Sequence, residues 1–346
     1  MDWIPTEEFL KSAERLPVID VRSPSEFSQG HIPGAFNIPL FNDGERAIVG
    51  TLYSKSGRDA SVLKGLELAG PKLAGFIRLV NPIAPGRKVL VHCWRGGMRS
   101  ESMAWLFEKA GLQTSVLRGG YKAYRKFIRE QFSRSLRLAI LGGLTGSGKT
   151  EILFSMAEAG EQVIDLEGLA HHKGSVFGSL GQLPQPTNEQ FENDLSELWR
   201  ALDKERMIWL EDESRMIGNV TLPEPLFALM NSAPLIRIQV PRQDRINRLV
   251  RDYAGFPKES LQEAIQKIRE KLGGTRFNLA MEALEKEDYA TVASLSLEYY
   301  DKAYEHSVLR RANPQVISLS FDSSDIKSYI ASIRKVTGSL IQNKKI

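Results

Sequence analysis

The 346-residue sequence predicts an α/β protein of two parallel-sheet domains, followed by a helical C-terminal region. The length exceeds what one ordinary hydrophobic core accommodates, so two domains are expected. Short apolar segments alternate with helical segments, which is the pattern of a parallel sheet covered by helices. Two glycine-rich loops, residues 93–99 and 143–150, each follow an apolar strand and precede a helix.

Composition limits the class of protein and its compartment. Hydrophobic residues make up 42% of the chain and charged residues 25%, as in soluble globular proteins. The single cysteine excludes an internal disulfide framework and fits a reducing compartment. The first 20 residues lack the pattern of a signal peptide, and no stretch approaches the ~20 apolar residues of a membrane span. We therefore expect a cytoplasmic protein that does not contact a membrane.

The first domain is expected over residues 1–132. Residues 87–93 are too apolar to alternate, which predicts a strand buried on both faces. Apolar residues at helical spacing predict a helix over 99–111, with Gly111 as its stop signal. A shorter strand is expected at 17–21, and a further strand and helix within 112–132.

The second domain is expected over residues 136–256, with the boundary near 132–136. Its predicted strands lie at 133–143, 161–167, 206–213 and 235–240, with helical segments between them. This alternation is typical of a nucleotide-binding α/β domain. Residues 257–346 are expected to form a helical region packed on that domain, with 257–311 entirely helical.

The stretch VHCWRGGMRS, residues 91–100, predicts an anion-binding loop with a reactive thiol. Gly96 and Gly97 can adopt positive φ, which lets the loop curl with its amide N–H groups pointing inward. Those amides, the N-terminus of the next helix and the Arg99 guanidinium would bind an anion and lower the pKa of the Cys93 thiol. The alternative is a buried and inert cysteine.

The stretch DVRSPSEFSQGHIPGAFNIP resembles the signature of rhodanese domains, and Cys93 falls where those domains carry their persulfide-forming cysteine. The resemblance implies a rhodanese-like parallel-sheet domain. The loop after Cys93 differs from the loop of rhodanese domains, because Trp94 follows the cysteine and the arginine, Arg99, comes one position later. The resulting Cys-x5-Arg spacing is the loop length of protein-tyrosine and dual-specificity phosphatases. We expect the longer loop to fit a tetrahedral phosphate. Asp20, Arg22 and His31 are interpreted as structural.

The stretch GGLTGSGKT, residues 142–150, is a complete Walker A motif between an apolar strand and a helix. It predicts a P-loop NTPase-like domain in which backbone amides bind a diphosphate, Lys149 neutralises it and Thr150 reaches Mg²⁺. ATP is the default ligand, yet any diphosphate offers the same oxygens. The predicted phosphate-binding residues are Gly96, Gly97, Gly143, Thr145, Gly146, Ser147, Gly148, Lys149 and Thr150.

Acidic and basic residues beyond the P-loop have two interpretations each. Asp165 and Asp212, at the ends of predicted strands, are either acids that assist a metal ion or solvated strand-end acids. Arginines at three-residue spacing form either a solvated face or a surface for phosphate or RNA. These arginines are Arg242, Arg245, Arg248 and Arg251. His171 and His172 lack further ligands at metal spacing and are placed near the phosphates.

The combination of HCWRGGMRS, GGLTGSGKT, DLEGLAHHKGS and EDESRMIG resembles bacterial tRNA 2-selenouridine synthases over nearly the whole chain. The resemblance implies conversion of 2-thiouridine to 2-selenouridine at the wobble position of tRNAs for lysine, glutamate and glutamine. It also implies two small-molecule substrates, geranyl diphosphate for S-geranylation of the thiouridine and selenophosphate as the selenium donor.

This resemblance gives each loop an expected role. The P-loop would hold the diphosphate of geranyl diphosphate while the thiouridine sulfur attacks the allylic carbon. Selenium would then pass by way of Cys93 to C2 of the base, with Arg95 and Arg99 holding the phosphate and geranylthiol leaving. The net charge of +4 fits an RNA partner. Tyr299, Tyr300 and Tyr304 would either stack on anticodon bases or pack in a helical core.

Three other classes of protein stay open at this point. A sulfurtransferase with an ATP-binding P-loop domain would use Cys93 as a persulfide carrier. A Cys-x5-Arg phosphatase fused to a kinase-like domain would need a carboxylic general acid, and Glu101 is the only close acid in sequence. A non-catalytic RNA-binding protein would need neither Cys93 nor Lys149.

Overall fold

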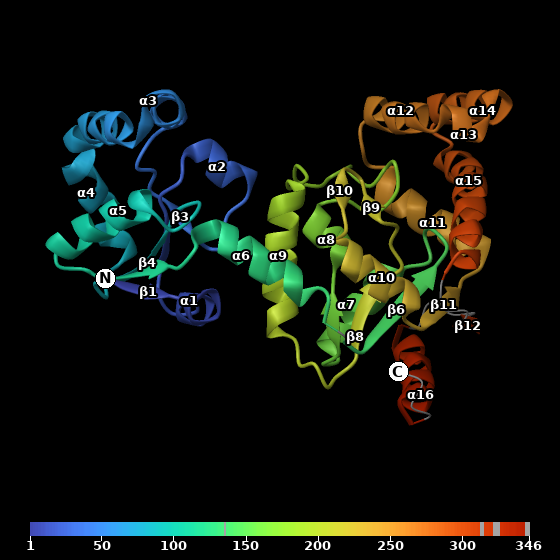
Figure 1. The fold of residues 1–346 in the computed structure, drawn as a ribbon. Coiled ribbons are helices and arrows are strands. Elements are labelled where there is room, and N and C mark those ends of the chain that lie inside the picture. The colour runs from blue at the N-terminus through green and yellow to red at the C-terminus, as the bar shows by residue number, and fades with distance from the viewer. Residues whose placement is uncertain (135, 312–314, 321–325, 343–346) are drawn as a thin grey trace. The chain divides into compact units, whose positions relative to one another are not determined.

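The computed structural model describes residues 1–134, 136–311, 315–320 and 326–342 (Figure 1). The chain divides into two compact units. The first comprises Met1–Phe132 together with Glu192–Glu197, and the second comprises Ser133–Phe191 and Leu198–Ile346. The α/β class predicted from the sequence is confirmed, because each unit contains a five-stranded parallel sheet.

The sheet of the first unit has the order β1-β5-β4-β2-β3, so β4 lies at its centre. Helix α3 is interrupted at Gly57, where φ is 84°. The elements are β1 (Asp2–Ile4), α1 (Thr6–Ala13), β2 (Val18–Asp20), α2 (Pro24–Gln29), β3 (Phe36–Asn37), α3 (Asp43–Ala69), a 3₁₀ turn (Gly70–Lys72), α4 (Leu73–Ile83), β4 (Lys88–His92), α5 (Met98–Lys109), β5 (Gln113–Leu117) and α6 (Gly120–Gln131).

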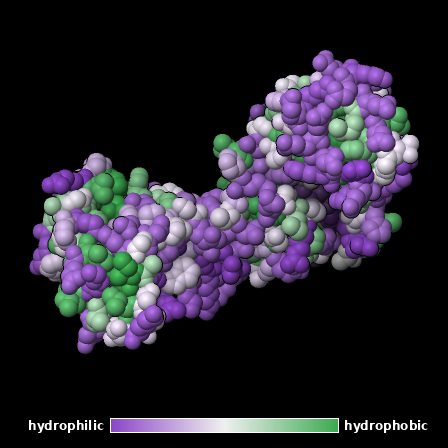
Figure 2. Space-filling model, turned by 90° about the horizontal axis from the view of Figure 1, so that it is seen from above, coloured by the Kyte–Doolittle hydropathy of each residue, from purple (hydrophilic) through white to green (hydrophobic). Residues whose placement is uncertain are grey.

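The middle of strand β4, Val89–Val91, is a continuous apolar run because both faces of its sheet are covered. Val89 and Val91 belong to a core cluster with side chains of α4 and α5, such as Phe107. Leu90 points to the other face and belongs to a cluster with α1 and α6, including Tyr121. Exposed apolar side chains also gather on α3 and α4, and hydrophobic residues are visible on this unit in Figure 2.

The sheet of the second unit has the order β12-β11-β6-β8-β7, with β6 at its centre. A separate antiparallel hairpin pairs β9 with β10. The elements are β6 (Leu138–Gly143), α7 (Lys149–Glu158), β7 (Gln162–Ile164), α8 (Leu166–Ala170), α9 (Asn188–Ala201), β8 (Ile208–Glu211), β9 (Met216–Ile217), β10 (Val220–Thr221), α10 (Glu224–Ser232), β11 (Leu235–Gln239) and α11 (Arg242–Tyr253).

The C-terminal region is helical as expected over residues 257–311, but it also contains a strand. Strand β12 pairs in parallel with β11 and extends the sheet of the second unit, which the sequence analysis did not predict. The elements are α12 (Lys258–Lys267), α13 (Arg269–Leu272), α14 (Gly274–Glu285), α15 (Tyr289–Leu309), β12 (Val316–Ser320) and α16 (Ile326–Gln342). Among the described residues, no helix is long and apolar enough to span a membrane.

Each glycine-rich loop follows the central strand of its own sheet. Cys93 comes directly after β4, which lies between β5 and β2, and the P-loop follows β6, which lies between β11 and β8. In open α/β sheets, ligands bind at the carboxyl ends of the strands, beside the point where the strand order reverses. Both predicted sites therefore lie where this class of fold places its ligands.

Candidate functional site

The Cys93 loop connects β4 to α5 and packs against the start of α6. Gly96 and Gly120 both have a φ of 61°. A Cβ on Gly96 would lie 2.6 Å from the Leu117 carbonyl oxygen, and one on Gly120 would lie 2.5 Å from the Cys93 carbonyl oxygen. Only glycine fits at these close approaches. Gly97 was also expected to adopt positive φ, and this was wrong, because its φ is −136°.

Hydrogen bonds surround the Cys93 sulfur, whose side chain is only 3% exposed. The Gly97 N–H donates to Sγ at 3.4 Å, and the Ser100 hydroxyl lies 3.3 Å from Sγ. Burial acts to raise the pKa of the thiol. The Gly97 N–H, the Ser100 hydroxyl and the Arg99 charge outweigh burial and lower the pKa of Cys93 below its ordinary value. The loop therefore favours the nucleophilic thiolate.

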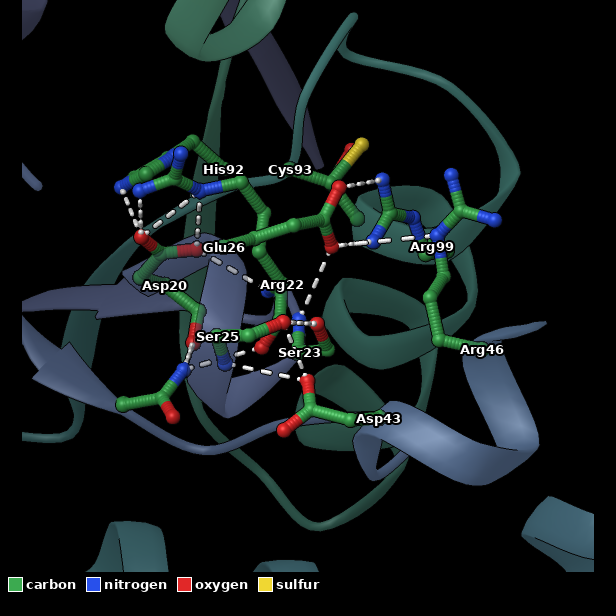
Figure 3. Close-up of polar contacts among 12 residues, drawn as sticks. Asp20, Arg22, Ser23, Ser25, Glu26, Asp43, Arg46, His92, Cys93 and Arg99 are labelled. Atoms are coloured by element: carbon green, nitrogen blue, oxygen red, sulfur yellow. Dashed lines mark hydrogen bonds and ion pairs between the residues drawn. The ribbon is translucent and has the colours of Figure 1, made fainter. Parts of the chain in front are cut away.

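The Arg99 guanidinium is held beside the loop by a carboxylate from α2 (Figure 3). Arg99 Nη1 donates to Glu26 Oε2 at 2.6 Å and Nη2 donates to Oε1 at 3.2 Å, while Arg46 Nε lies 3.8 Å from Oε2. Burial acts to raise the pKa of Glu26, but these partners lower it. Glu26 was missed, although it lies within the quoted rhodanese-like signature. Arg95 is exposed and makes no ion pair with any described residue.

Asp20 and Arg22 form a buried ion pair with an N–O distance of 2.6 Å, as their structural interpretation implies. The Arg22 guanidinium also lies 3.7 Å from the centre of the Tyr121 ring. His92 lies against Asp20, and burial is the main cause that lowers the pKa of His92 to about 4. His31 Nδ1 lies 3.1 Å from a backbone carbonyl of α2. These contacts fix the loop before α2 next to β4.

The P-loop curls around the N-terminus of α7. Gly146 and Gly148 have φ values of 79° and 82°, which L-amino acids with side chains rarely adopt. Lys149 Nζ donates to the Gly143 carbonyl at 3.1 Å. The Ser147 hydroxyl is buried and has no hydrogen-bond partner among the described residues. The loop thus has the curvature and the free donors that a phosphate group would use.

A cavity of about 1060 Å³ opens over the P-loop within the second unit. Its wall includes both ends of the P-loop, the carboxyl end of β8, and side chains from α11 and α15. Lys149, Thr150, Arg248 and Tyr304 are among the lining residues. The cavity combines cations with acids, which is suited to a phosphorylated ligand and a metal ion together.

Three glutamates form a carboxylate cluster in this cavity. Carboxylate oxygens of Glu167, Glu211 and Glu213 all lie within 4.8 Å of one another. Burial, then repulsion between the neighbouring carboxylates, raises the pKa of Glu167 and of Glu211 to about 8, and that of Glu213 to about 7. Neither oxygen of Glu211 has a hydrogen-bond partner within the described part of the chain. A divalent cation would satisfy these oxygens, so the cluster fits one.

The two acids predicted to assist a metal ion lie outside this cluster, although both line the cavity. The Asp165 side chain accepts the Gly168 N–H at 2.8 Å and caps α8, because β7 ends earlier than predicted. Asp212 accepts hydrogen bonds from Arg311 at 2.5 Å and from Tyr304 at 2.9 Å. Both carboxylates therefore accept hydrogen bonds from protein groups.

The four arginines of α11 do not form one free basic surface. Arg245 is buried, bonds to both oxygens of Asp301 at 2.8 Å and donates to the Thr145 carbonyl of the P-loop at 3.2 Å, so its role at the phosphates stays a prediction. Arg242 donates to the Ser294 carbonyl at 2.9 Å. Arg248 also reaches the P-loop, donating to the Gly146 carbonyl at 2.8 Å. Arg251 binds Glu151 at the rim of the cavity.

The tyrosines of α15 contact protein groups, which supports the packing interpretation. The Tyr300 hydroxyl accepts the Val176 N–H at 3.0 Å, and Tyr299 packs against the apolar cluster of α12–α15. His171 and His172 were expected near the phosphates, but neither lines the cavity. His171 Nδ1 instead lies 2.8 Å from the Pro184 carbonyl oxygen.

Fold and loops together define a protein with a rhodanese-like domain and a P-loop domain on one chain. Family models match both parts, a rhodanese-like domain over residues 6–127 and the "tRNA 2-selenouridine synthase AAA domain" over residues 136–336. The chain belongs to the tRNA 2-selenouridine synthase family. Relatives named tRNA 2-selenouridine synthase support this over nearly their full length.

Three of these relatives show the extent of the similarity. The protein from Marinobacter nauticus is 34% identical, covering 88% of this chain and 93% of the relative. That from Bdellovibrio bacteriovorus is 37% identical, covering 86% and 90%. That from Sulfurovum sp. is 34% identical, covering 90% and 95%.

Proposed function

We propose that this protein is a tRNA-modifying transferase that converts wobble 2-thiouridine to 2-selenouridine by way of an S-geranylated intermediate. Geranyl diphosphate and selenophosphate would be its small-molecule substrates, and tRNAs for lysine, glutamate and glutamine its macromolecular substrates. Membership of the family supports tRNA modification. The presence of two separate anion-binding loops, one with an activated thiol, supports two partial reactions.

The second unit carries the geranyl transfer in this proposal. The amides of the P-loop and Lys149 bind the diphosphate, and Arg248 lies at the same loop. Thr150 with the Glu167–Glu211–Glu213 cluster would hold Mg²⁺, which neutralises charge on the leaving diphosphate. The thiouridine sulfur forms a bond to the allylic carbon, the carbon–oxygen bond breaks, and inorganic diphosphate leaves. This geranyl transfer does not consume ATP.

In this proposal, the first unit releases selenide from selenophosphate. Selenium in selenophosphate is already at the selenide level, so a selenium–sulfur bond to Cys93 would need an oxidant. Attack of the Cys93 thiolate on phosphorus needs none, because a sulfur–phosphorus bond forms, the phosphorus–selenium bond breaks and selenide leaves. Water then cleaves the sulfur–phosphorus bond. The Cys-x5-Arg loop, with Arg99 at its end, has the length used for phosphoryl groups.

Selenide would complete the reaction on the geranylated base. It adds to C2, the carbon–sulfur bond breaks, and geranylthiol leaves. Alkylation is needed first because an S-alkylated sulfur departs as a thiol, whereas a thiocarbonyl sulfur is a poor leaving group. One observation carries the proposal: a Cys-x5-Arg thiol of lowered pKa and a P-loop cavity coexist in a chain of this family.

Substitution of one residue in each loop separates the two partial reactions. Cys93→Ser should leave geranylation intact and block selenation, while Lys149→Ala should lower geranylation by roughly a hundredfold through lost charge stabilisation. The measurement is mass spectrometry of nucleosides from a 2-thiouridine anticodon stem-loop incubated with geranyl diphosphate, Mg²⁺ and selenophosphate. Lys126→Ala, at an exposed lysine of the first unit, is the control.

The outcomes also separate the other classes of protein. A sulfurtransferase would produce no geranylated nucleoside and would transfer sulfur from thiosulfate through Cys93. A phosphatase fused to a kinase-like domain would hydrolyse phosphoesters and leave 2-thiouridine unmodified. Retention of both partial reactions in Cys93→Ser and Lys149→Ala would refute the proposed roles of the two loops.

A further inference from the structure

A second guanidinium, that of Arg46, lies close to the Cys93 loop and has no part in the reaction proposed above. It comes from the start of α3 and was not predicted from the sequence. Its Nε lies 3.8 Å from Glu26 Oε2, and Glu26 is the carboxylate that accepts two hydrogen bonds from Arg99. Figure 3 shows both guanidiniums beside this carboxylate. One acid therefore brings together arginines of α3 and α5.

The start of α3 is fixed, which gives Arg46 a defined position. Asn42 and Glu45 form a capping box, with hydrogen bonds of 2.8 and 2.9 Å between side chains and backbone N–H groups. Lys72 binds the Glu45 carboxylate at 2.6 Å. Gly50 lies one turn after Arg46, and a Cβ there would lie 2.6 Å from Arg46 Nη1. The lack of a side chain at Gly50 leaves room for the guanidinium.

The charges around Glu26 leave one cation uncompensated. Arg99 and Glu26 form a bidentate pair that is formally neutral, and such a pair alone attracts an anion weakly. Among the described residues, Glu26 is also the only ion-pair partner of Arg46. Asp43, another acid at the start of α3, is directed to Ser25, whose N–H and hydroxyl it accepts at 3.0 and 2.6 Å. Arg46 therefore gives this place a net positive charge.

Arg46 also has an unused hydrogen-bond donor. Its Nε is buried and has no hydrogen-bond partner among the described residues. The contact of 3.8 Å with Glu26 is an ion pair and is too long for a hydrogen bond. Arg99 keeps donors as well, because a guanidinium carries more N–H groups than the two that Glu26 accepts. Two guanidiniums with free donors and a net positive charge match the oxygens of a phosphate group.

We propose that Arg46 and Arg99 together bind a phosphate group at the Cys93 loop, with Glu26 positioning both guanidiniums. The inference rests on the proposed function and adds a phosphate-binding residue to it. Two sources offer the same oxygens, namely the phosphoryl end of the selenium donor and a phosphodiester of the RNA. A phosphate bound there restricts access to the thiol, since Arg99 belongs to the loop that surrounds Cys93 Sγ.

Protection of Cys93 from alkylation tests the site without selenium chemistry. Inorganic phosphate should slow iodoacetamide labelling of the wild type at constant pH and ionic strength, and Cys93 is the only cysteine. Arg46→Met keeps a long side chain without its charge, so the phosphate concentration that gives half-protection should rise at least roughly tenfold. Each rate is compared with that of the same variant in phosphate-free buffer. Arg58→Met, at an exposed arginine further along α3, should match the wild type.

A second variant displaces the Arg46 guanidinium without removing its charge. Gly50→Ala places a Cβ against Arg46 Nη1, and the end of that flexible side chain is the part that moves. Phosphate protection should weaken as in Arg46→Met, although alanine favours a helix more than glycine does. The control is Gly44→Ala on the same helix, where the nearest atom to the new Cβ would be 3.5 Å away. Gly44→Ala should match the wild type.

Binding of a 2-thiouridine anticodon stem-loop identifies the source of the phosphate. Fluorescence anisotropy of the labelled stem-loop gives its Kd for the wild type, Arg46→Met and Arg58→Met. A Kd raised at least roughly tenfold in Arg46→Met alone assigns the site to an RNA phosphodiester. An equal Kd together with weakened phosphate protection assigns it to the donor. If Arg46→Met matches the wild type in both measurements, the inference is overturned.

The results distinguish failure of this inference from failure of the proposed function. If the wild type forms no 2-selenouridine but Arg46→Met weakens phosphate protection of Cys93, the phosphate site stands and the proposed reaction is wrong. If the wild type forms 2-selenouridine and Arg46→Met matches it in phosphate protection, stem-loop affinity and rate of selenation, the proposed reaction stands and Arg46 binds no phosphate.

Discussion

At Cys93, burial and hydrogen bonding act on the thiol pKa in opposite directions. A cysteine that is 3% exposed at the end of a central strand would ordinarily be inert. The Gly97 N–H and the Ser100 hydroxyl both lie close to Sγ and stabilise the charged form, with Arg99 adding a positive charge. The site therefore combines restricted access with thiolate character, which suits a nucleophile that meets one specific donor.

The contribution of Ser100 can be measured from the pH dependence of Cys93 alkylation. Because the alkylation rate follows the thiolate fraction, the midpoint for the wild type should lie below that of free cysteine. Ser100→Ala removes a group that stabilises the thiolate, so the midpoint should move to higher pH and alkylation at pH 7 should slow. Cys93 is the only cysteine, so iodoacetamide labelling followed by intact-protein mass spectrometry reports this site alone.

Ser28→Ala, on an exposed serine of α2, should leave the midpoint where it is. Comparing midpoints removes the effect of burial on the absolute rate. A wild-type midpoint equal to or above that of free cysteine would show that burial dominates, and would remove the activated thiol from the proposed mechanism.

Residues in local motifs could be predicted from the sequence, and residues that depend on distant contacts could not. Cys93 and Lys149 lie in loops whose function follows from spacing on one strand–loop–helix segment. Glu26 and Glu211 act through segments distant in sequence, Glu26 on Arg99 and Glu211 within the glutamate cluster. A signal was missed here, since Glu211 and Glu213 are two residues apart at the end of β8, the spacing at which strand side chains share a face.

Among the elements, central strands were predictable because burial on both faces gives them a continuous apolar run. Strands β4 and β6 follow this pattern, whereas β12 has partly exposed side chains at the edge of its sheet and gave no comparable signal. Helices α3 and α4 were not predicted from the sequence. The interruption of α3 at Gly57 and the exposed apolar side chains on its surface obscure the helical period.

The length of the loop between β4 and α5 should decide which donor the first unit accepts. Deleting Gly97 converts Cys-x5-Arg to Cys-x4-Arg, which should abolish selenation from selenophosphate while sparing sulfur transfer from thiosulfate, because the shorter loop still fits a single sulfur atom. Nucleoside mass spectrometry measures the first activity, and thiocyanate formation from thiosulfate and cyanide measures the second.

Gly97→Ala is the matched control, because it keeps the loop length. A Cβ at this position would have no atom within 4 Å, and its φ of −136° is accessible to alanine. This variant should retain most of its activity with both donors. Equal loss of both activities in the deletion variant would contradict the size argument. It would show that the deletion disrupts the structure of the loop and does not select between donors.

At the scale of the whole molecule, the two units do not correspond to two uninterrupted segments. Residues Glu192–Glu197, in the middle of α9, group with the first unit, although the rest of α9 groups with the second. The division at residue 132 expected from the sequence leaves these six residues out of the first domain. The sequence predicts only that α9 is an amphipathic helix. It does not show that residues 192–197 contact the first unit, because those partners are distant in sequence.

Asn193 joins this segment to the first unit, as Glu192 does through Arg125, and replacing Asn193 should destabilise that unit. Its side chain is fully buried, donates to the His31 carbonyl at 2.8 Å and to the Tyr121 hydroxyl at 2.7 Å, and accepts from Arg125 at 2.6 Å. Asn193→Leu removes this shared partner from buried polar groups, which should lower the free energy of unfolding by roughly 3 kcal/mol.

Urea denaturation followed by tryptophan fluorescence measures the change, and Asn219→Leu, at an exposed asparagine of the second unit, is the control. A fragment of residues 1–132 lacks Asn193 altogether, so it should unfold at a lower urea concentration than the first unit of the intact chain. If the fragment and the intact chain lose their first-unit structure at the same urea concentration, the α9 segment contributes no stability and the uninterrupted division at residue 132 is the better description.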